Sequence, residues 1–183
     1  MRIPQLFPVM LLAACWFAQP ALADSGAEID ADVNEALATF KSEVNGAEVF
    51  LNGAAGVLVF PRVIKAGIGI GGEYGKGALR VGGQTVDYYS TAAGSIGFQL
   101  GAQAKSIVIA FMTQEALKKF RSSAGFKVGV DGSVALIDLG AGKTIDTANI
   151  TDPVVGFVFG SKGLMYNLTL EGTKFTKLDM GED

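Results

Sequence analysis

The stretch Ala55–Val81 reads AGVLVFPRVIKAGIGIGGEYGKGALRV and decides the fold. A β-branched run ends at Phe60-Pro61, and six glycines then occur in the eleven positions from 67 to 77. Glycine weakens the interior of a strand, because it costs backbone entropy and offers no side chain to pack. So many glycines indicate that the backbone passes close to another strand, turns a tight corner or lines a ligand groove. We expect sharp corners in a small closed sheet, with a ligand groove as the alternative.

The N-terminal residues have the features of an export signal. Arg2 is the only charged residue before Asp24, and an apolar stretch runs from Leu6 to Ala18. Ala21-Leu22-Ala23 supplies the small-x-small pattern of a cleavage site. We therefore predict a signal peptide over residues 1–23 and an exported, periplasmic protein. The apolar stretch is too short to span a bilayer comfortably.

A second signal overlaps the first. Leu12-Ala13-Ala14-Cys15 fits a bacterial lipoprotein cleavage box, in which Cys15 would carry the lipid and anchor the protein to the envelope. The residues that follow Cys15 are still apolar, whereas a lipoprotein tether is usually polar. The soluble periplasmic form is therefore the prediction, and anchoring through Cys15 is the alternative. Because Cys15 is the only cysteine, no disulfide is expected in either form.

Composition argues against several classes of function. Removal of residues 1–23 takes away one of the 15 basic residues, Arg2, and leaves all 18 acidic ones, so the net charge changes from −3 to −4. This balance argues against nucleic acid as a partner, since nucleic-acid binding relies on clustered Lys and Arg. Histidine, the commonest general base and metal ligand, is absent, and no pair of carboxylates stands out. We expect a non-enzymatic protein with no catalytic residues, no metal and no cofactor.

Two helices are predicted before the first strand. Ser25 and Glu28 form an S-x-x-E capping box, and apolar residues then recur at steps of three and four. The opposite face of this helix is acidic, whereas a helix on a membrane surface is normally rich in Lys and Arg. We therefore expect the helix to pack on the sheet rather than insert into lipid. Asn45-Gly46 ends it, and a short second helix is expected from Ala47 to Asn52.

Strand signals dominate from residue 56 onward, with one further helix that Thr113 caps and whose apolar side is Leu117 and Phe120. No low-complexity linker divides the chain, so residues 24–183 are expected to form a single domain. The predicted fold is α+β, with N-terminal amphipathic helices packed on a compact, mostly antiparallel, glycine-rich β-sheet or barrel-like sheet, and one further helix. The expected strands are Gly56–Phe60, Gly67–Glu73, Ala78–Val81, Thr85–Ser90, Ser95–Gln103, Ser106–Phe111, Phe126–Val130, Ser133–Leu139, Val154–Phe159, Leu164–Leu170 and Lys174–Leu178.

One nucleotide-binding motif matches in sequence but lacks the helix that it needs. Gly67-x-Gly69-x-x-Gly72 matches the dinucleotide fingerprint. That fingerprint works where its glycines lead a strand into a helix whose N-terminus meets the pyrophosphate. The residues from Glu73 to Gly77 cannot open a stable helix, so we do not expect dinucleotide binding.

The candidate binding residues are cations and a tyrosine near the glycine-rich stretch. Arg62, Lys65 and Lys76 flank it, and Arg80 lies near the end of the next strand. Cations beside exposed backbone N–H groups can receive a phosphate head group, although ordinary solvated strand ends would have the same composition. Tyr74 offers an amphipathic contact of the kind found at lipid interfaces. Lys65, Lys76, Arg80 and Tyr74 are therefore the proposed lipid-binding residues.

Three ordered blocks of sequence carry a family resemblance. They are Gly56–Pro61 with the glycine-rich residues up to Gly77, then Gly94–Gln103, then Ser161–Leu164 with Leu170–Gly172. With these blocks the chain resembles the SYLF family, a domain also described as actin-binding in yeast endocytic proteins, over about Ala31 to Leu178. The resemblance implies a phospholipid-binding domain. Bacterial members resemble secreted proteins or lipoproteins of the cell envelope.

The resemblance and the missing catalytic groups together predict a non-enzymatic, exported phospholipid-binding domain that acts at the bacterial cell envelope. A phospholipid or membrane surface is the expected partner. The alternative is a periplasmic or outer-membrane-tethered scaffold that binds an envelope protein or itself through sheet edges. We do not expect actin as a partner, because an exported bacterial protein would not meet it. The N-terminal helix also lacks the basic residues with which eukaryotic members bind membranes.

Overall fold

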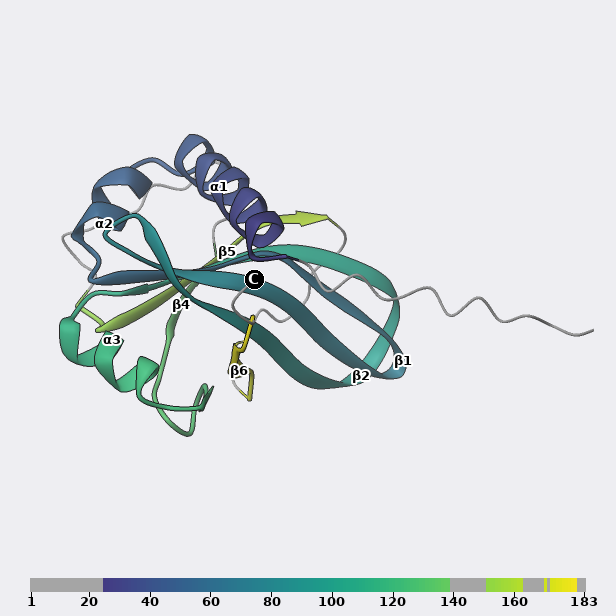
Figure 1. Ribbon diagram of the computed structural model, residues 1–183. Coiled ribbons are helices and arrows are strands. Elements are labelled where there is room, and N and C mark those ends of the chain that lie inside the picture. Colours follow the sequence, from purple (N-terminus) through teal and green to yellow (C-terminus); the bar gives the residue numbers. More distant parts are fainter. Residues whose placement is uncertain (1–24, 139–150, 163–169, 171, 181–183) are drawn as a thin grey trace, which may run out of the picture.

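The computed structural model describes residues 25–138, 151–162, 170 and 172–180. Over these residues three helices pack on a curled, mostly antiparallel sheet, which confirms the predicted α+β fold (Figure 1). None of the helices in this part of the chain is long and apolar enough to cross a membrane. The elements are α1 (Gly26–Glu43), α2 (Ala47–Gly53), β1 (Gly56–Val81), β2 (Gln84–Phe111), α3 (Gln114–Arg121), β3 (Gly125–Lys127), β4 (Ala135–Asp138), β5 (Val154–Lys162) and β6 (Lys174–Leu178).

The helices begin where the sequence places their caps. The Ser25 side chain accepts a hydrogen bond from the Glu28 N–H (3.2 Å), and the Glu28 carboxylate accepts one from the Ser25 N–H (2.9 Å), which confirms the capping box. Gly46 separates α1 from α2 with a φ of 86°, a left-handed conformation that glycine adopts without steric cost. The Thr113 side chain accepts from the Ala116 N–H and starts α3.

β1 and β2 form one continuous two-stranded ribbon. They pair antiparallel from Gly56, opposite Phe111, to the hairpin turn at Gly82-Gly83. The six short strands predicted over these residues therefore merge into two long ones. The gap predicted after Phe60 contains a bulge, which breaks the alternation of side chains without ending the pairing. The register shifts fall between Phe60/Val63, Gly67/Gly69 and Leu79/Arg80.

The ribbon folds back on itself at its glycine-rich middle (Figure 1). A Cβ atom added to Gly67 would lie 2.3 Å from the Cα of Gly71, so this corner has no room for a side chain on its inner side. Cβ atoms added to Gly75 and Gly77 would lie 2.7 and 2.0 Å from carbonyl oxygens in the first half of β1. The two halves of β1 therefore meet in backbone contact, and the corner that the glycines predict is present.

The folded ribbon has an inner face, where its two halves meet, and an outer face. Leu58 and Leu79 belong to the buried cluster of the inner face, which also contains the apolar side of α3. Val59 and Ala78 belong to the cluster of the outer face, which contains the buried side of α1 and α2. The predicted packing of the N-terminal helix on the sheet is thus confirmed, and α1 and α3 lie on opposite sides of it (Figure 1).

The remaining strands complete the sheet along the second edge of β2. β5 pairs with its C-terminal part and β6 with its N-terminal part, both antiparallel. β3 then pairs with β6, and β4 lies parallel to β5. β6 has the bounds that the sequence predicts, whereas β3 and β4 are shorter than predicted. In the described part of the chain β1 pairs with β2 alone, so no described strand pairs with its other edge.

Some predictions fall on residues that the structure does not describe. The signal peptide over 1–23 and the lipidation alternative at Cys15 lie outside the described residues. So do most of the strand predicted at Leu164–Leu170 and the loop predicted from Gly140 to Asp152.

Candidate functional site

The outer face of the ribbon continues beyond α1 as an apolar surface between Arg62 and Lys76 of β1. After the bulge at residues 61–62, alternate residues of β1 point outward. Ile70, Tyr74 and Ile64 are the large ones among them, with 78%, 52% and 42% of their surface exposed. Small residues of β2 lie opposite and complete this surface. We call it the tip face, formed by Ile64, Ala66, Ile70, Gly72 and Tyr74 of β1 and by Ala92 and Gly94 of β2.

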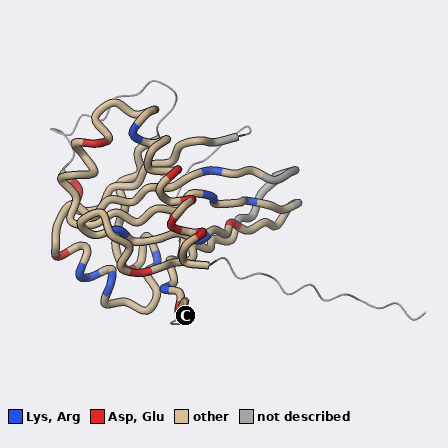
Figure 2. Tube along the Cα trace, turned by 45° about the horizontal axis from the view of Figure 1, so that its top comes forward, with Lys and Arg blue, Asp and Glu red and all other residues tan. Residues whose placement is uncertain are grey.

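The tip face differs from the other exposed apolar residues of the described chain. Val49 and Val130 are similarly exposed but lie singly, on α2 and in a turn, and isolated exposed apolar residues are normal. The tip face instead places three large side chains on one projecting ribbon. Figure 2 shows the charged residues along the coloured part of the ribbon. Large apolar side chains exposed together on one element are typical of a place of contact with a partner or a membrane.

Lys65 lies on the inner face, away from the tip face. Its ammonium is 3.5 Å from Oε1 of Glu73, and the ammonium of Lys105 is 2.7 Å from Oε2 of the same carboxylate. Lys105 is only 6% exposed. Two cations therefore share one carboxylate, mostly shielded from water, where the two halves of β1 face each other. This inner cluster ties the corner of the ribbon to β2.

Arg80 is bound to α1. Its Nη2 lies 3.0 Å from Oδ1 of Asn34 and 3.4 Å from Oδ1 of Asp30. The same Asp30 carboxylate accepts hydrogen bonds from the hydroxyls of Thr85 (2.6 Å) and Tyr88 (3.1 Å). Burial, together with this hydrogen bond, raises the pKa of Tyr88. The arrangement fixes the start of α1 on the sheet.

The four predicted lipid-binding residues therefore do not meet in one place. Tyr74 lies in the tip face, and Lys76, partly buried, follows it on the same face of β1. Lys65 lies inside and Arg80 lies against α1. Ile64 and Ile70 were not singled out from the sequence. Their signal is the alternation of apolar and other residues that resumes after Pro61.

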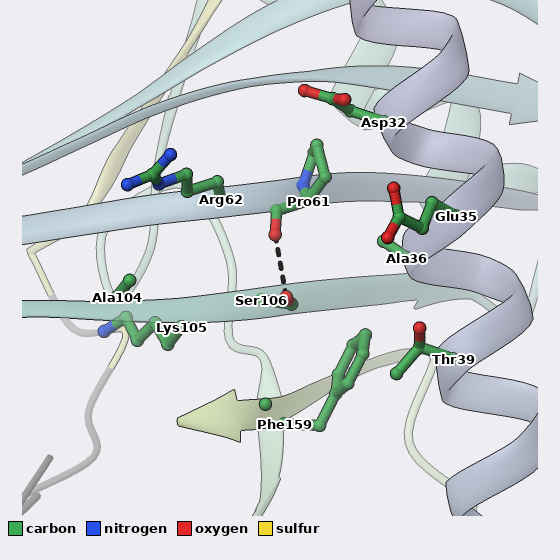
Figure 3. Close-up of a pocket in the computed structure, with 11 residues that line it drawn as sticks. Asp32, Glu35, Ala36, Thr39, Pro61, Arg62, Ala104, Lys105, Ser106 and Phe159 are labelled. Atoms are coloured by element: carbon green, nitrogen blue, oxygen red, sulfur yellow. Dashed lines mark hydrogen bonds between the residues drawn. The ribbon is translucent and has the colours of Figure 1, made fainter. Parts of the chain in front are cut away.

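A cavity of about 530 Å³ opens between α1 and the ribbon, next to the tip face (Figure 3). Asp32 and Glu35 come to it from α1, and Arg62 and Lys105 come from the two strands. The Ser106 hydroxyl donates to the carbonyl oxygen of Pro61 (2.7 Å). This bond holds the bulge that forms the cavity floor.

In the described part of the chain, no group of three His, Cys, Asp or Glu side chains is arranged to hold a metal ion. The titratable residues of the cavity belong to two walls, and Figure 3 shows them apart from one another. The geometry therefore provides charges for binding, in the cavity, and an apolar contact surface, in the tip face.

The comparison with protein families agrees with this fold. A family model described as "Ysc84: Las17-binding protein actin regulator" matches residues 92–180. The chain contains a SYLF domain. The SYLF match starts within β2 and runs to β6, so it includes Ala92 and Gly94 of the tip face. No curated protein matches the chain.

Proposed function

We propose that this SYLF protein is a non-enzymatic, exported phospholipid-binding protein that acts at the bacterial cell envelope. The SYLF family is associated with lipid or actin binding. The observation that carries the proposal is the tip face, where Ile70 and Tyr74 are exposed on one face of a projecting ribbon. An exported protein meets membranes and does not meet actin.

The chemistry of the tip face suits the boundary between head groups and acyl chains. Ile64 and Ile70 offer apolar side chains, and Tyr74 offers a ring with a polar end, which is the type of residue that favours this boundary. Moving Ile70 and Tyr74 out of water is worth about 2–4 kcal/mol. Lys76, next on the same face, lies where it can meet head-group phosphates.

A vesicle flotation assay tests the proposal. We expect the purified protein to float with vesicles of phosphatidylethanolamine and phosphatidylglycerol. In the double variant Ile70→Ser, Tyr74→Ser the bound fraction should fall about tenfold or more, because the apolar contact is lost. The melting temperature should stay unchanged, since both side chains are exposed.

The matched control removes the same kind of surface elsewhere. Val49→Ser with Val130→Ser exchanges two side chains that are 70% and 72% exposed and lie outside the tip face. This variant should float like the unaltered protein. Equal losses in both variants, or no flotation of the unaltered protein, would reject the tip face as a membrane contact.

The processing and cellular location of the protein are tested separately. Mass spectrometry of the N-terminus of the mature protein should find Asp24 as the first residue. A diacylated Cys15 would instead support the anchored form, and an intact Met1 would exclude export by either route.

The open edge of β1 favours a second candidate function, a scaffold that binds an envelope protein or another copy by strand addition. An unpaired edge presents backbone N–H and C=O groups to a partner strand. Cross-linking in the envelope fraction distinguishes this function from lipid binding, because a scaffold gives a defined protein adduct that persists in the Ile70→Ser, Tyr74→Ser variant.

A further inference from the structure

The cavity beside the tip face has walls of opposite charge. Asp32 and Glu35 occupy the α1 wall, and Arg62 lies on the strand side (Figure 3). Lys105 also lines the cavity, but its ammonium is paired with Glu73. In Figure 3 the two cationic groups extend away from the helix that carries the carboxylates. The cavity therefore has a negative end and a positive end.

The charges at the two ends do not neutralise one another. Over the described residues, the side chains of Arg62, Asp32 and Glu35 make no ion pair or hydrogen bond. Lys105 is held by Glu73, on the inner face. Arg62 is thus the cation available to a bound anion, and Asp32 and Glu35 are the carboxylates available to a bound cation.

We propose that this cavity binds a zwitterion in which a phosphate is joined to a primary ammonium, the chemistry of a phosphoethanolamine head group. Arg62 binds the phosphate, because its planar group donates two parallel hydrogen bonds to phosphate oxygens. Asp32 and Glu35 accept hydrogen bonds from the ammonium. A volume of about 530 Å³ is within the range of small-molecule sites.

The lining favours a primary over a quaternary ammonium. Quaternary ammonium groups have no N–H to donate and are usually held by several aromatic rings. Among the described residues that line this cavity, Phe159 is the single aromatic one. Two carboxylates without an aromatic cage therefore suit ethanolamine better than choline.

The place of the cavity connects it to the tip face. Arg62 stands two residues before Ile64 on β1, on the same outer face. A lipid whose acyl region met the tip face would carry its head group at the height of the cavity. Binding of a membrane lipid in the cavity rests on the proposed function, whereas binding of a soluble head group is independent of it.

Calorimetric titration of the purified full-length protein with glycerophosphoethanolamine tests the site. We expect saturable binding with one ligand per chain. Arg62→Ala should weaken it about tenfold, the loss of a charge-assisted pair, and Asp32→Asn with Glu35→Gln should do the same. Glycerophosphocholine should bind about tenfold more weakly than glycerophosphoethanolamine. Inorganic phosphate alone should be weaker still and insensitive to the Asp32→Asn, Glu35→Gln change.

Charge-matched controls lie on α3, outside the cavity. Lys119→Ala and Glu115→Gln each remove one charge, positive and negative, from an exposed position and should leave the titration unchanged. The proposal is overturned if glycerophosphoethanolamine does not bind saturably, if glycerophosphocholine binds equally well, or if the cavity variants behave like these controls.

A vesicle arm identifies the source of the head group. Stronger flotation with phosphatidylethanolamine in phosphatidylcholine than with phosphatidylcholine alone, abolished by Arg62→Ala, assigns the site to a membrane lipid. Saturable binding of the soluble head group without that preference assigns it to a free metabolite. Loss of all flotation in Ile70→Ser, Tyr74→Ser with an unchanged titration would separate the tip face from the cavity.

Discussion

Glycines play different structural roles in two regions of the same ribbon. The first region, which we call the crossing, is where Gly75 and Gly77 lie against the backbone of the first half of β1. A Cβ atom at Gly77 would lie 2.0 Å from the carbonyl oxygen of Val59. At the tip, a Cβ atom on Gly94 would meet nothing within 4 Å, and one on Gly72 would lie 3.7 Å from its nearest neighbour. Packing thus requires glycine at Gly75, Gly77 and the corner residue Gly67, whereas at Gly72 and Gly94 glycine only keeps the surface small and uncharged.

The largest expected effect is at the crossing. Gly77→Ala should destabilise the protein by about 3 kcal/mol or more, because the methyl group collides with backbone and with the Phe60 ring, neither of which can move without shifting a strand. Urea unfolding measures this loss.

The tip supplies the control. Gly72→Ala and Gly94→Ala meet no obstacle, and each removes backbone freedom from the unfolded chain, so stability should be unchanged or rise by about 0.5–1 kcal/mol. If Gly94→Ala proved as damaging as Gly77→Ala, the two regions would not differ as described.

A smaller effect is expected at the inner cluster, which lies between the crossing and the tip. Glu73→Gln leaves Lys65 and Lys105 without the carboxylate that they share, and should lower the free energy of unfolding by about 2–3 kcal/mol. The loss is smaller than for a fully buried pair because Lys65 and Glu73 keep some contact with water. Glu48→Gln is the matched control, since Glu48 forms an exposed 4.0 Å pair with Lys41 and should change stability by less than about 0.5 kcal/mol. A loss in urea unfolding no greater than in that control would show that the cluster does not hold the corner.

The smallest effect at neutral pH is expected at Tyr89, which pairs with Gly77 across the ladder. Its hydroxyl is buried with no hydrogen-bond partner among the described residues, and burial raises the pKa of Tyr89 to about 12. The unfolded chain releases this proton near pH 10. Between about pH 10 and 12 deprotonation therefore stabilises the unfolded state relative to the folded state, and the free energy of unfolding falls as pH rises. Tyr89→Phe should keep or raise stability at neutral pH and reduce the alkaline loss.

Unfolding curves collected across that pH range test this prediction, with Tyr74→Phe at the exposed tip as the comparison. An alkaline loss of the same size in Tyr89→Phe and in the unaltered protein would assign it to other groups.

Much of the local structure could be predicted from the sequence, because it depends on near neighbours. Ser25 with Glu28 and Thr113 mark helix starts through side chains that bond to backbone within the same turn. The predicted bounds of β6 also agree with the structure. The long strands were predicted in pieces for two reasons. The bulge between Phe60 and Val63 shifts the alternation and resembles a strand end when no partner strand is in view. The gaps predicted at residues 74–77 and 91–94 contain no bulge, and the pairing runs through them.

The placement of the candidate cations could not be predicted in this way. Lys65 reaches Glu73 only because the ribbon turns back at Gly67 and Gly71, and Lys105 joins them from the other strand. Arg80 finds Asp30 fifty positions away in sequence. The position of the corner determines which lysines lie on the outer face of β1. The glycine pattern predicts that a corner is present but does not give the direction in which the strand turns.

The long β1–β2 ladder also has a consequence for where the domain can be divided. The SYLF match begins at residue 92, inside β2, whereas β2 is paired with β1 from end to end. A fragment cut at that boundary would leave the central strand without one partner and without the cover of α1, and Val108 and Ala110 would face water. The folding unit is therefore longer at its N-terminal side than the region recognised by family comparison.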